Sequence, residues 1–327
     1  MNSLSQTQEP NGLEPAQWAW LQAETGARAV LGAQRLQSLW SGYGEILRLQ
    51  LQGAKVPSLI LKRVAPPALT QSDRSHARKL ESYQVEQSWY RDWSSHCPAR
   101  IPGCYATASF GSEQLLLLED LDAAGFGLRR RQPNRAELRQ CLDWLARFHA
   151  AFIGAEPTGL WPRGTYWHLA TRPDELAAIQ DPVLRQAAGL IDARLAACRF
   201  RTLVHGDAKP ANVCFSAAGP VAMLDFQYVG GGCGVQDVAY LLDASLNQTQ
   251  LVRELPELLD SYFESLRTAL ATQGFQHSQA LEAEWRELFP LAWTDFQRFL
   301  AGWMPGWQAD AFSRRMIDEV IQNLQSD

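Results

Sequence analysis

Three oxygen-bearing side chains, Asp207, Asn212 and Asp225, are the residues best able to act together in chemistry. Asn212 follows Asp207 by five positions, and two short apolar runs, 213–216 and 221–224, separate it from Asp225. The two runs with the four residues between them predict a β-hairpin that sets Asn212 opposite Asp225. A carboxylate and an amide oxygen at one point, with Asp207 near them, form the sparse oxygen set with which proteins bind Mg²⁺ jointly with phosphate oxygens.

This spacing, an Asp, an Asn five residues on, then a hairpin and an Asp-Phe, is the phosphoryl-transfer arrangement of kinases. His205-Gly206-Asp207 with Asn212 and Asp225 resembles the aminoglycoside phosphotransferase and choline kinase superfamily, in which His-Gly-Asp stands where protein kinases have His-Arg-Asp. The strings LEDL…GF at 118–126 and DFQ…DVAY at 225–240 resemble the ecdysteroid-kinase-like (CHK) branch of that superfamily. The resemblance covers most of the chain.

The resemblance implies a phosphotransferase with an alcohol group as acceptor, using ATP and Mg²⁺ as cofactors. Asp207 would take or orient the proton of the attacking hydroxyl, and Asn212 and Asp225 would hold the metal ions. Lys209 would steady the γ-phosphate. The acceptor is a small molecule: the branch suggests a sterol-like or other apolar alcohol, whereas the superfamily includes aminoglycosides, choline and sugars. The alternative is a nucleotide-binding pseudokinase that acts as a sensor or scaffold.

A lysine that could hold the nucleotide lies on the strand predicted at 58–64. Lys62 shares a face of that strand with apolar residues, and a lysine on such a face is rarely left unpaired. Glu86 shares a helix face with aromatic residues, so it points inward and is the expected partner, with Glu81 as the competing one. In kinases such a pair positions the α- and β-phosphates.

Two further segments are candidates for nucleotide contacts. Gly42 and Gly44 lie between two predicted strands and either fold over the phosphates through their backbone N–H groups or form a plain turn. Glu119 and Leu121 lie where the resemblance joins the two lobes, and backbone groups there are expected to meet the adenine ring. A plain acidic linker is the alternative for that segment.

Several neighbours of the loop are predicted to support it and not to react. Asp237 is expected to bond the backbone of the loop, His205 to brace it, and His149 to be a buried supporting histidine. The glycine-rich segment 230–234 is predicted to be too flexible for a strand or a helix.

The elements that must position these residues follow from hydrophobic periodicity. Strands are predicted at 36–40, 45–51, 58–64, 104–110 and 114–118, and helices at 71–96, 134–153, twice between 172 and 198, and from 235 onward with breaks near Pro256, Gly274, Pro290 and Pro305. This is an α+β class and, by the resemblance, a two-lobed protein-kinase-like fold with a small antiparallel sheet plus one helix before a larger helical lobe. The predicted parts are a flexible tail (1–15), an N-lobe (16–118), a hinge (119–124) and a C-lobe (125–327).

Aromatic residues gather in the last helices and in the segment before the loop, where they form either core or the wall of an acceptor pocket. They are Trp161, Tyr166, Trp167, Trp285, Phe289, Trp293, Phe296, Phe299, Trp303 and Trp307. Asp295 and Asp310 are alternative sites for a cationic acceptor.

Composition excludes several classes of protein. A formal net charge of −5 disfavours a nucleic-acid binder, and no apolar run approaches the roughly 18 residues of a membrane span. The first residues lack the basic and apolar regions of a secretory signal, and the six cysteines form no C-x-x-C pair. We therefore expect a cytoplasmic protein with reduced cysteines, without nucleic-acid or membrane partners, as a monomer or homodimer.

Overall fold

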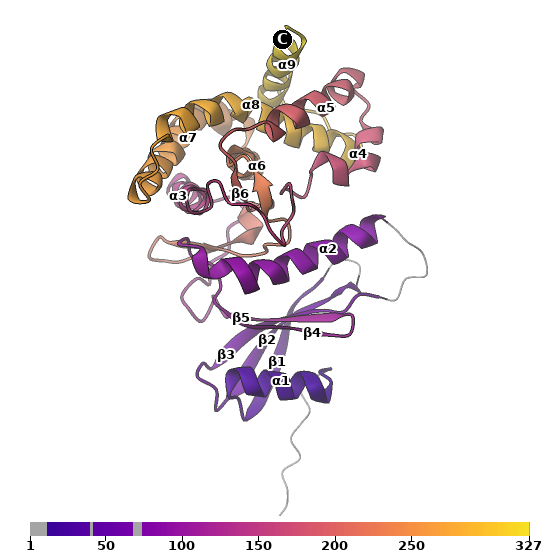
Figure 1. Ribbon diagram of the computed structural model, residues 1–327, viewed down its shortest axis with the longest axis vertical. Helices are drawn as coiled ribbons and strands as arrows, with labels where there is room; N and C mark the ends of the chain where they lie inside the picture. The colour runs from indigo at the N-terminus through magenta and orange to yellow at the C-terminus, as the bar shows by residue number, and fades with distance from the viewer. Residues whose placement is uncertain (1–11, 40–41, 68–73, 327) are drawn as a thin grey trace, which may run out of the picture. The chain divides into compact units, whose positions relative to one another are not determined.

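The computed structural model describes three ranges of the chain, 12–39, 42–67 and 74–326. The chain divides into two compact units (Figure 1). Unit 1 runs to Ser95 and includes Ile101–Gly127, and unit 2 holds His96–Arg100 and the residues from Leu128 onward. Unit 1 is built on a sheet and unit 2 mainly on helices, so the predicted α+β class is confirmed.

Unit 1 contains a five-stranded antiparallel sheet in the order β1-β2-β3-β5-β4. Its strands are β1 (Ala29–Ser38), β2 (Gly44–Gln52), β3 (Ser58–Val64), β4 (Cys104–Phe110) and β5 (Glu113–Glu119). Alternation along the central strands turns Leu49, Leu61 and Leu117 to one face, where they form a buried cluster with Leu21. Successive residues point to opposite faces, so Lys62 lies on the other face of β3.

A helix that the sequence analysis missed, α1 (Pro15–Thr25), packs on the apolar face of this sheet. It starts with proline at its first position and with a reciprocal capping box between Glu14 and Gln17, and it ends at Gly26, which has a φ of 69°. The signals at the start of the helix are visible in the sequence, but the predicted tail (1–15) included Glu14 and Pro15. The first eleven residues of that tail lie outside the described residues.

The second helix of unit 1 lies on the opposite side of the sheet from α1 (Figure 1). It comprises α2 (Arg74–Ser88), a π-helical turn over Trp89–Trp93 and a 3₁₀ turn over Ser94–His96. The predicted helix at 71–96 is thus helical over its described length, and residues 71–73 lie outside that part of the structure. Unit 1 has two α-helices in its described residues, where one was predicted.

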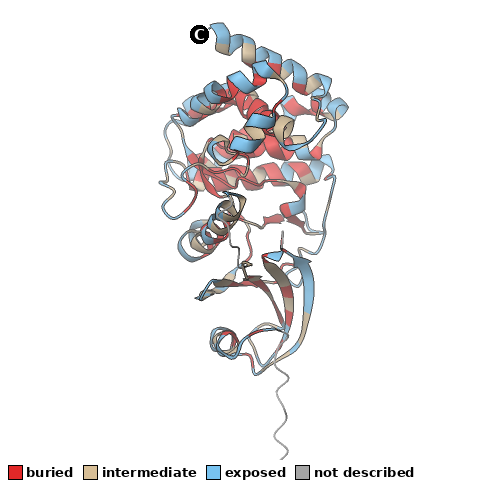
Figure 2. Ribbon diagram, turned by 90° about the vertical axis from the view of Figure 1, so that its right-hand side faces the viewer, coloured by how far each residue is buried: buried red, intermediate tan, exposed pale blue. Residues whose placement is uncertain are grey.

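Unit 2 is mainly helical, and many of its buried residues lie in its helices (Figure 2). The helices are α3 (Arg135–Ala151), α4 (Pro173–Ala178), α5 (Pro182–Ala196), α6 (Val235–Ser245), α7 (Gln248–Thr272), α8 (Ser278–Trp303) and α9 (Ala311–Ser326). As predicted, Asn134 caps α3, here in a capping box with Glu137. The described helices include none with both the length and the apolar character needed to cross a bilayer.

Two prolines lie inside helices where breaks were predicted. Pro256 is within α7 and Pro290 within α8, whereas Gly274 and Pro305 do lie between helices. A proline removes one backbone hydrogen bond, and helices of this length retain enough packed apolar surface to outweigh that loss.

The glycine-rich segment forms a strand, which corrects the prediction that it is too flexible for one. β9 (Gly230–Gly232) pairs antiparallel with β6 (Thr202–Val204). A Cβ on Gly230 would lie 2.2 Å from the carbonyl oxygen of Trp161, and one on Gly232 would lie 2.9 Å from the Val204 side chain. These glycines therefore allow close packing of backbone on backbone, which flexibility-based reasoning overlooks.

Candidate active site

The loop that carries Asp207 is held by a buried carboxylate at the start of α6. Asp237 accepts hydrogen bonds from the backbone N–H of His205 through Oδ2 (2.6 Å) and from that of Gly206 through Oδ1 (2.9 Å). The Nε2 atom of His149, from α3, lies 3.1 Å from the same Oδ2. Asp237 and His149 are both fully buried, so the predicted supporting roles of these two residues are confirmed.

His205 braces the loop from inside, as predicted. Its Nδ1 accepts the backbone N–H of Asp207 at 3.2 Å, and its Nε2 lies 3.2 Å from the carbonyl oxygen of Leu224. Burial lowers the pKa of His205, which favours the neutral ring, and a neutral ring that accepts at Nδ1 donates at Nε2. Both nitrogens are thereby committed to backbone groups.

The Asp207 carboxylate is surrounded by donors. Lys209 Nζ lies 3.0 Å from Oδ1 and 2.8 Å from Oδ2. The Asn212 amide nitrogen donates to Oδ2 and to the Asp207 carbonyl oxygen, both at 2.9 Å. The hydroxyl of Tyr240, on α6, donates to Oδ1 at 3.3 Å. Three of the residues expected in the site are therefore in direct contact, and Tyr240 is an additional one that appeared in the sequence only within the DVAY string.

Burial raises the pKa of the Asp207 carboxyl to about 6. Lys209 and the hydrogen bonds act against this rise, whereas the charge of Asp225 adds to it. A carboxyl with this pKa is ionised at neutral pH yet basic enough to accept a proton from a polarised hydroxyl. The repulsion also means that Asp225 lies near Asp207.

The hairpin that joins Asn212 to Asp225 is present with a register different from the predicted one. The last residue of β7 (Val213–Phe215) pairs with the first residue of β8 (Val221–Met223), so five residues form the connection and not four. Asn212 therefore lies opposite Leu224, whose N–H donates to the Asn212 carbonyl oxygen at 3.1 Å. The predicted pairing of Asn212 with Asp225 is wrong by one residue.

Asp225 has a left-handed backbone conformation, with a φ of 72°. Few residues other than glycine adopt this region, and aspartate is one of those that tolerate it. Asp225 lies two residues beyond the end of β8. Strained residues of this kind concentrate at functional sites, where the surrounding structure holds them.

The donor set around Asn212 and Asp225 fits a hard cation that shares its coordination with phosphate and water. The Asn212 amide nitrogen is committed to Asp207, so its Oδ1 is the atom suited to ligation, and Asp225 supplies carboxylate oxygens. Among the described residues, no group of three or more His, Cys, Asp or Glu side chains could hold a metal ion. Mg²⁺ is bound in this sparse way, through one or two carboxylates plus substrate phosphates.

In unit 1, Lys62 and Glu86 form a buried ion pair, with 2.6 Å between Nζ and Oε2. The ammonium group also lies 5.8 Å from the ring centroid of Tyr83. Glu81, the competing partner, is exposed on another part of the α2 surface. The pair expected from the sequence is therefore present, on the face of β3 that carries no leucine cluster.

Gly42 lies in the connection between β1 and β2 and Gly44 is the first residue of β2; their φ values are 75° and 135°. A Cβ on Gly44 would lie 2.0 Å from the carbonyl oxygen of Arg63, because β2 and β3 run close together there. Around Gly42, no atom of the described residues lies within 4 Å of such a Cβ. Ser41, between the strands, is outside the described residues. Close packing accounts for Gly44, and a turn with positive φ accounts for Gly42.

The segment around Glu119 and Leu121 is tied into unit 1. Glu119 accepts the Gly103 N–H through Oε2 at 2.9 Å, and its own N–H donates to the Gly103 carbonyl oxygen at 2.8 Å. The Leu121 carbonyl oxygen accepts the Phe126 N–H at 2.8 Å, and the Leu121 side chain is buried.

The residue between them, Asp120, belongs to a charge network that the sequence analysis did not find. Its buried carboxylate accepts from Arg48 Nε at 2.9 Å and from the Ser58 hydroxyl at 2.8 Å. Arg48 also pairs with Asp122. In the sequence, the alternation of Arg48 with leucines predicted only that Arg48 faces away from the apolar side of β2. In the structure, Arg48 holds the segment of Asp120 and Asp122 in place.

Most of the aromatic residues considered for an acceptor pocket are core residues. Trp161, Trp167, Trp285, Phe289, Trp293, Phe296 and Phe299 are all buried. Trp303 is 53% exposed and stacks on Phe299 with 5.8 Å between ring centroids. Asp295 accepts hydrogen bonds from Trp167 and Arg298, and Asp310 accepts the Ser313 N–H at the start of α9. Both carboxylates thus have internal partners.

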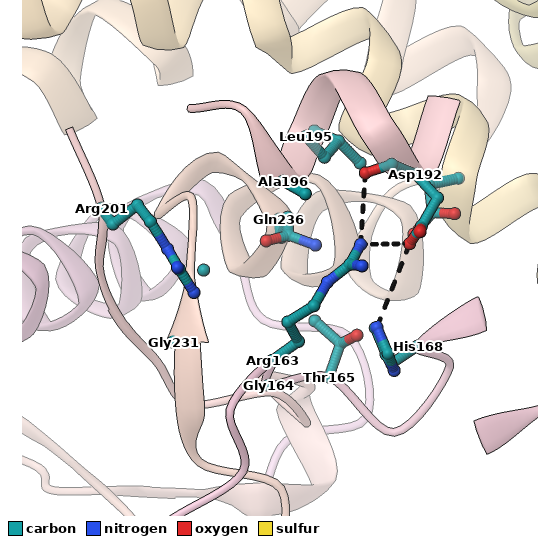
Figure 3. Close-up of a pocket in the computed structure, with 12 residues that line it drawn as sticks. Arg163, Gly164, Thr165, His168, Asp192, Leu195, Ala196, Arg201, Gly231 and Gln236 are labelled. Carbon is teal, nitrogen blue, oxygen red and sulfur yellow. Dashed lines mark hydrogen bonds and ion pairs between the residues drawn. The ribbon is translucent and has the colours of Figure 1, made fainter. Parts of the chain in front are cut away.

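A polar cavity of about 20 Å³ lies in unit 2 beside β9 and α5 (Figure 3). Arg163 bonds the Asp192 carboxylate there, and His168 Nε2 lies 4.0 Å from the same group. This volume holds about one water molecule, and Asp207 does not line the cavity. The cavity is therefore neither a nucleotide site nor an acceptor site.

Comparison with known proteins finds one matching family and solved structures of similar fold. The model of the phosphotransferase enzyme family (APH) matches residues 45–275. The solved structure of the amicoumacin kinase hAmiN with AMP-PNP, Ca²⁺ and Ami has a TM-score of 0.53 at 14% identity, covering 96% of this chain and 94% of that one. A microcompartment-associated aminopropanol kinase has a TM-score of 0.49 at 14% identity, covering 95% and 94%. No curated protein matches the sequence.

Proposed function

The chain belongs to the phosphotransferase enzyme family, and from this premise we propose that it is an ATP-dependent kinase that transfers the γ-phosphoryl group to a hydroxyl of a small molecule. One observation carries the proposal: Asp207 is a buried carboxyl of raised pKa, in contact with Lys209 and Asn212 and close to Asp225. That combination provides a proton acceptor, a mobile cation and oxygen ligands in one place.

Asp207 would act as the base. Its pKa of about 6 lets it orient the acceptor hydroxyl and take its proton as the bond to phosphorus forms. Lys209 would serve the phosphate side of the reaction. Its side chain is 35% exposed, so its ammonium group is free to move from the Asp207 carboxylate to the γ-phosphate when the nucleotide arrives.

Asn212 and Asp225 would hold Mg²⁺, Asn212 through Oδ1 and Asp225 through its carboxylate. The ion, when bound, neutralises charge on the transferring phosphoryl group. Binding also relieves the repulsion between Asp207 and Asp225, which is the physical reason that this pair of carboxylates favours a cation.

In unit 1, Lys62 would contact the α- and β-phosphates, oriented by Glu86. Gly42 and Gly44 would lie over the phosphates, and backbone groups at Glu119 and Leu121 would meet the adenine. For these four residues the packing described above is a sufficient explanation of their local structure, so the assignment rests on family membership. The ecdysteroid-kinase-like branch and an apolar alcohol as acceptor are likewise proposals.

The first test identifies the acceptor and the base together. A metabolite library is screened for acceptor-stimulated ADP release, and the product is identified by mass spectrometry. We expect Asp207→Asn to lower kcat by about 10³-fold, because general-base catalysis contributes on that order. Asp192→Asn is the matched control, since it removes a half-buried carboxylate of unit 2 outside the proposed site.

An Asp207→Asn variant that phosphorylates the acceptor at the wild-type rate would refute the mechanism. Binding of MgATP with no turnover on any acceptor, together with ATP-dependent capture of a protein, would instead support the pseudokinase alternative.

A further inference from the structure

Thr165 has a backbone conformation that its side chain disfavours. Its φ is 81°, and in the part of the chain that the structure describes Asp225 is the only other non-glycine residue with a positive φ. A β-branched residue is strained in this region, whereas glycine adopts it freely. Such strain persists only where the surrounding structure holds the residue in place. Glycine could form the same backbone, so the reason for threonine lies in its side chain.

The Thr165 hydroxyl is buried without a partner. Thr165 is 4% exposed, and among the described residues no group hydrogen-bonds its Oγ1. The Nε2 atom of His168 is likewise buried and has no hydrogen bond to those residues. The Asp192 carboxylate lies 4.0 Å from that nitrogen, beyond hydrogen-bond distance, and Arg163 binds it. Because an unsatisfied buried polar group costs free energy, both atoms call for a further partner.

A turn brings these two unpaired atoms to one cavity. The His168 N–H donates to the Thr165 carbonyl oxygen at 3.3 Å, which closes a turn over residues 165–168. Both residues line the polar cavity of about 20 Å³ beside β9 and α5 (Figure 3). A cavity of this volume holds about one water molecule, so a single occupant lies within reach of both atoms.

The charges around the cavity favour a neutral occupant. Two arginines and two aspartates line it: Arg163, Arg201, Asp192 and Asp295. Each carboxylate already has an internal cation, Arg163 for Asp192 and Arg298 for Asp295. Burial lowers the pKa of His168, so its ring is neutral at neutral pH. An ion of either sign would therefore enter without a free counter-charge, whereas a water molecule needs none.

We propose that this cavity is a binding site for one buried water molecule, which joins the Thr165 hydroxyl to His168 Nε2. Water suits the pair because it both donates and accepts, so it complements a hydroxyl and either tautomer of a neutral imidazole. Anchored through this water, the side chain holds the Thr165 backbone in its strained conformation. The site itself does not depend on the proposed function, whereas its effect on turnover rests on that function.

The backbone that the water holds supports the loop of Asp207. The N–H of Tyr166, the next residue, donates to the Gly206 carbonyl oxygen at 3.0 Å, and Asp237 binds the Gly206 N–H. A Cβ on Gly206 would lie 2.7 Å from the Thr165 nitrogen, so the two backbones are in direct contact. Gly206 directly precedes Asp207. A shift of the Thr165 backbone would therefore displace the base.

The experiment counts long-lived waters in the full-length protein by magnetic relaxation dispersion of water deuterons. Thr165→Val keeps the shape of the side chain and removes the hydroxyl. We expect the dispersion amplitude of this variant to fall by the equivalent of about one water molecule. Thr165→Ser, which keeps a hydroxyl, should retain the wild-type amplitude. Thr268→Val, which removes an exposed hydroxyl of α7, is the matched control and should leave the amplitude unchanged.

A crystal structure of the wild-type protein tests the site without a variant. We expect one electron-density peak in the cavity, at about 2.7 to 3.2 Å from Thr165 Oγ1 and from His168 Nε2. A cavity without density would overturn the inference, and so would equal deuteron dispersion in the wild type and Thr165→Val. An anomalous peak in the cavity of crystals soaked in bromide would also overturn it, because the occupant would then be an anion.

The positioning of the loop has a readout of its own. We expect Thr165→Val to lower kcat for the acceptor by about 10- to 100-fold, because a base displaced by a fraction of an ångström to one ångström reacts slowly, and Thr165→Ser to restore it. Loss of the water with an unchanged kcat would overturn this role. If the water is found in a protein that phosphorylates no acceptor, the proposed function is refuted and the water site stands.

Discussion

At the scale of single residues, the buried Asp207 carboxyl sets the pH behaviour of the site. Its pKa of about 6, raised by burial, predicts that kcat/KM for the acceptor falls on the acid side with an apparent pKa near 6. The profile is measured under saturating MgATP, from pH 5 to 8. A flat rate across pH 5 to 7 would contradict a base with this environment.

The same shift makes Asp207 a destabilising group. Its folded pKa of about 6 lies above the ordinary value of 3.8, so the folded state binds the proton more tightly and stability falls as pH rises from about 4 to 6. We expect Asp207→Asn to increase the free energy of unfolding at pH 7 by roughly 1 to 3 kcal/mol, and to give little gain at pH 4. Urea unfolding at the two pH values measures this, and an equal effect at both would contradict it.

Lys62 and Glu86 allow structure and function to be separated. Removing one partner leaves the other charge buried and unpaired, so Lys62→Met and Glu86→Gln should each lower the free energy of unfolding by about 3 kcal/mol. The double variant should recover most of that loss, because neither charge remains. If the pair is only structural, the double variant should also recover ATP binding. If Lys62 binds phosphate, the double variant should remain impaired in ATP binding.

At the scale of elements, the glycine strand β9 yields a paired test. Gly230→Ala forces a Cβ to within 2.2 Å of a backbone oxygen, so it should destabilise the protein by about 3 kcal/mol. Gly189 is at an exposed position of α5, and in the described part of the chain no atom lies within 4 Å of such a Cβ there. Gly189→Ala should therefore stabilise by about 0.5 to 1 kcal/mol, and thermal unfolding distinguishes the two signs.

The β7–β8 hairpin shows where sequence reasoning ends. The apolar runs predicted both strands, yet connections of four and five residues suit a hairpin equally, and a shift of one residue changes which side chains are opposite. The positive φ of Asp225 is a second feature that the sequence analysis did not predict. Spacing predicted the contact between Asp207 and Asn212, but not which residue lies opposite Asn212 in the hairpin.

Signals that act locally were predicted well. The cap at Asn134, the alternation in β2 and β3 and the inward lysine are each decided by neighbours in the sequence. The contacts of Tyr240 with Asp207 and of Arg48 with Asp120 join residues 33 and 72 positions apart, and a single sequence holds no record of such pairings.

At the scale of the whole molecule, binding of nucleotide should increase the free energy of unfolding. With Mg·AMP-PNP at 100 times its dissociation constant, the free energy of unfolding should rise by about 2.7 kcal/mol. A chelator should abolish most of that rise, since the proposed ligands Asn212 and Asp225 hold the metal only together with phosphate. Equal stabilisation with and without the chelator would argue against a metal-bound nucleotide.

The buried carboxylate of Asp237 has a consequence for how activity is lost. It joins the N–H groups of His205 and Gly206 to helix α6 and to His149 on α3, so the reactive loop shares its bonds with the framework of unit 2. We therefore expect that the loop does not unfold separately from α3 and α6. On slow heating, we expect the turnover rate to stay almost unchanged until α3 and α6 unfold. Activity should then be lost within the few degrees over which those helices unfold, so that inactivation is abrupt and not gradual.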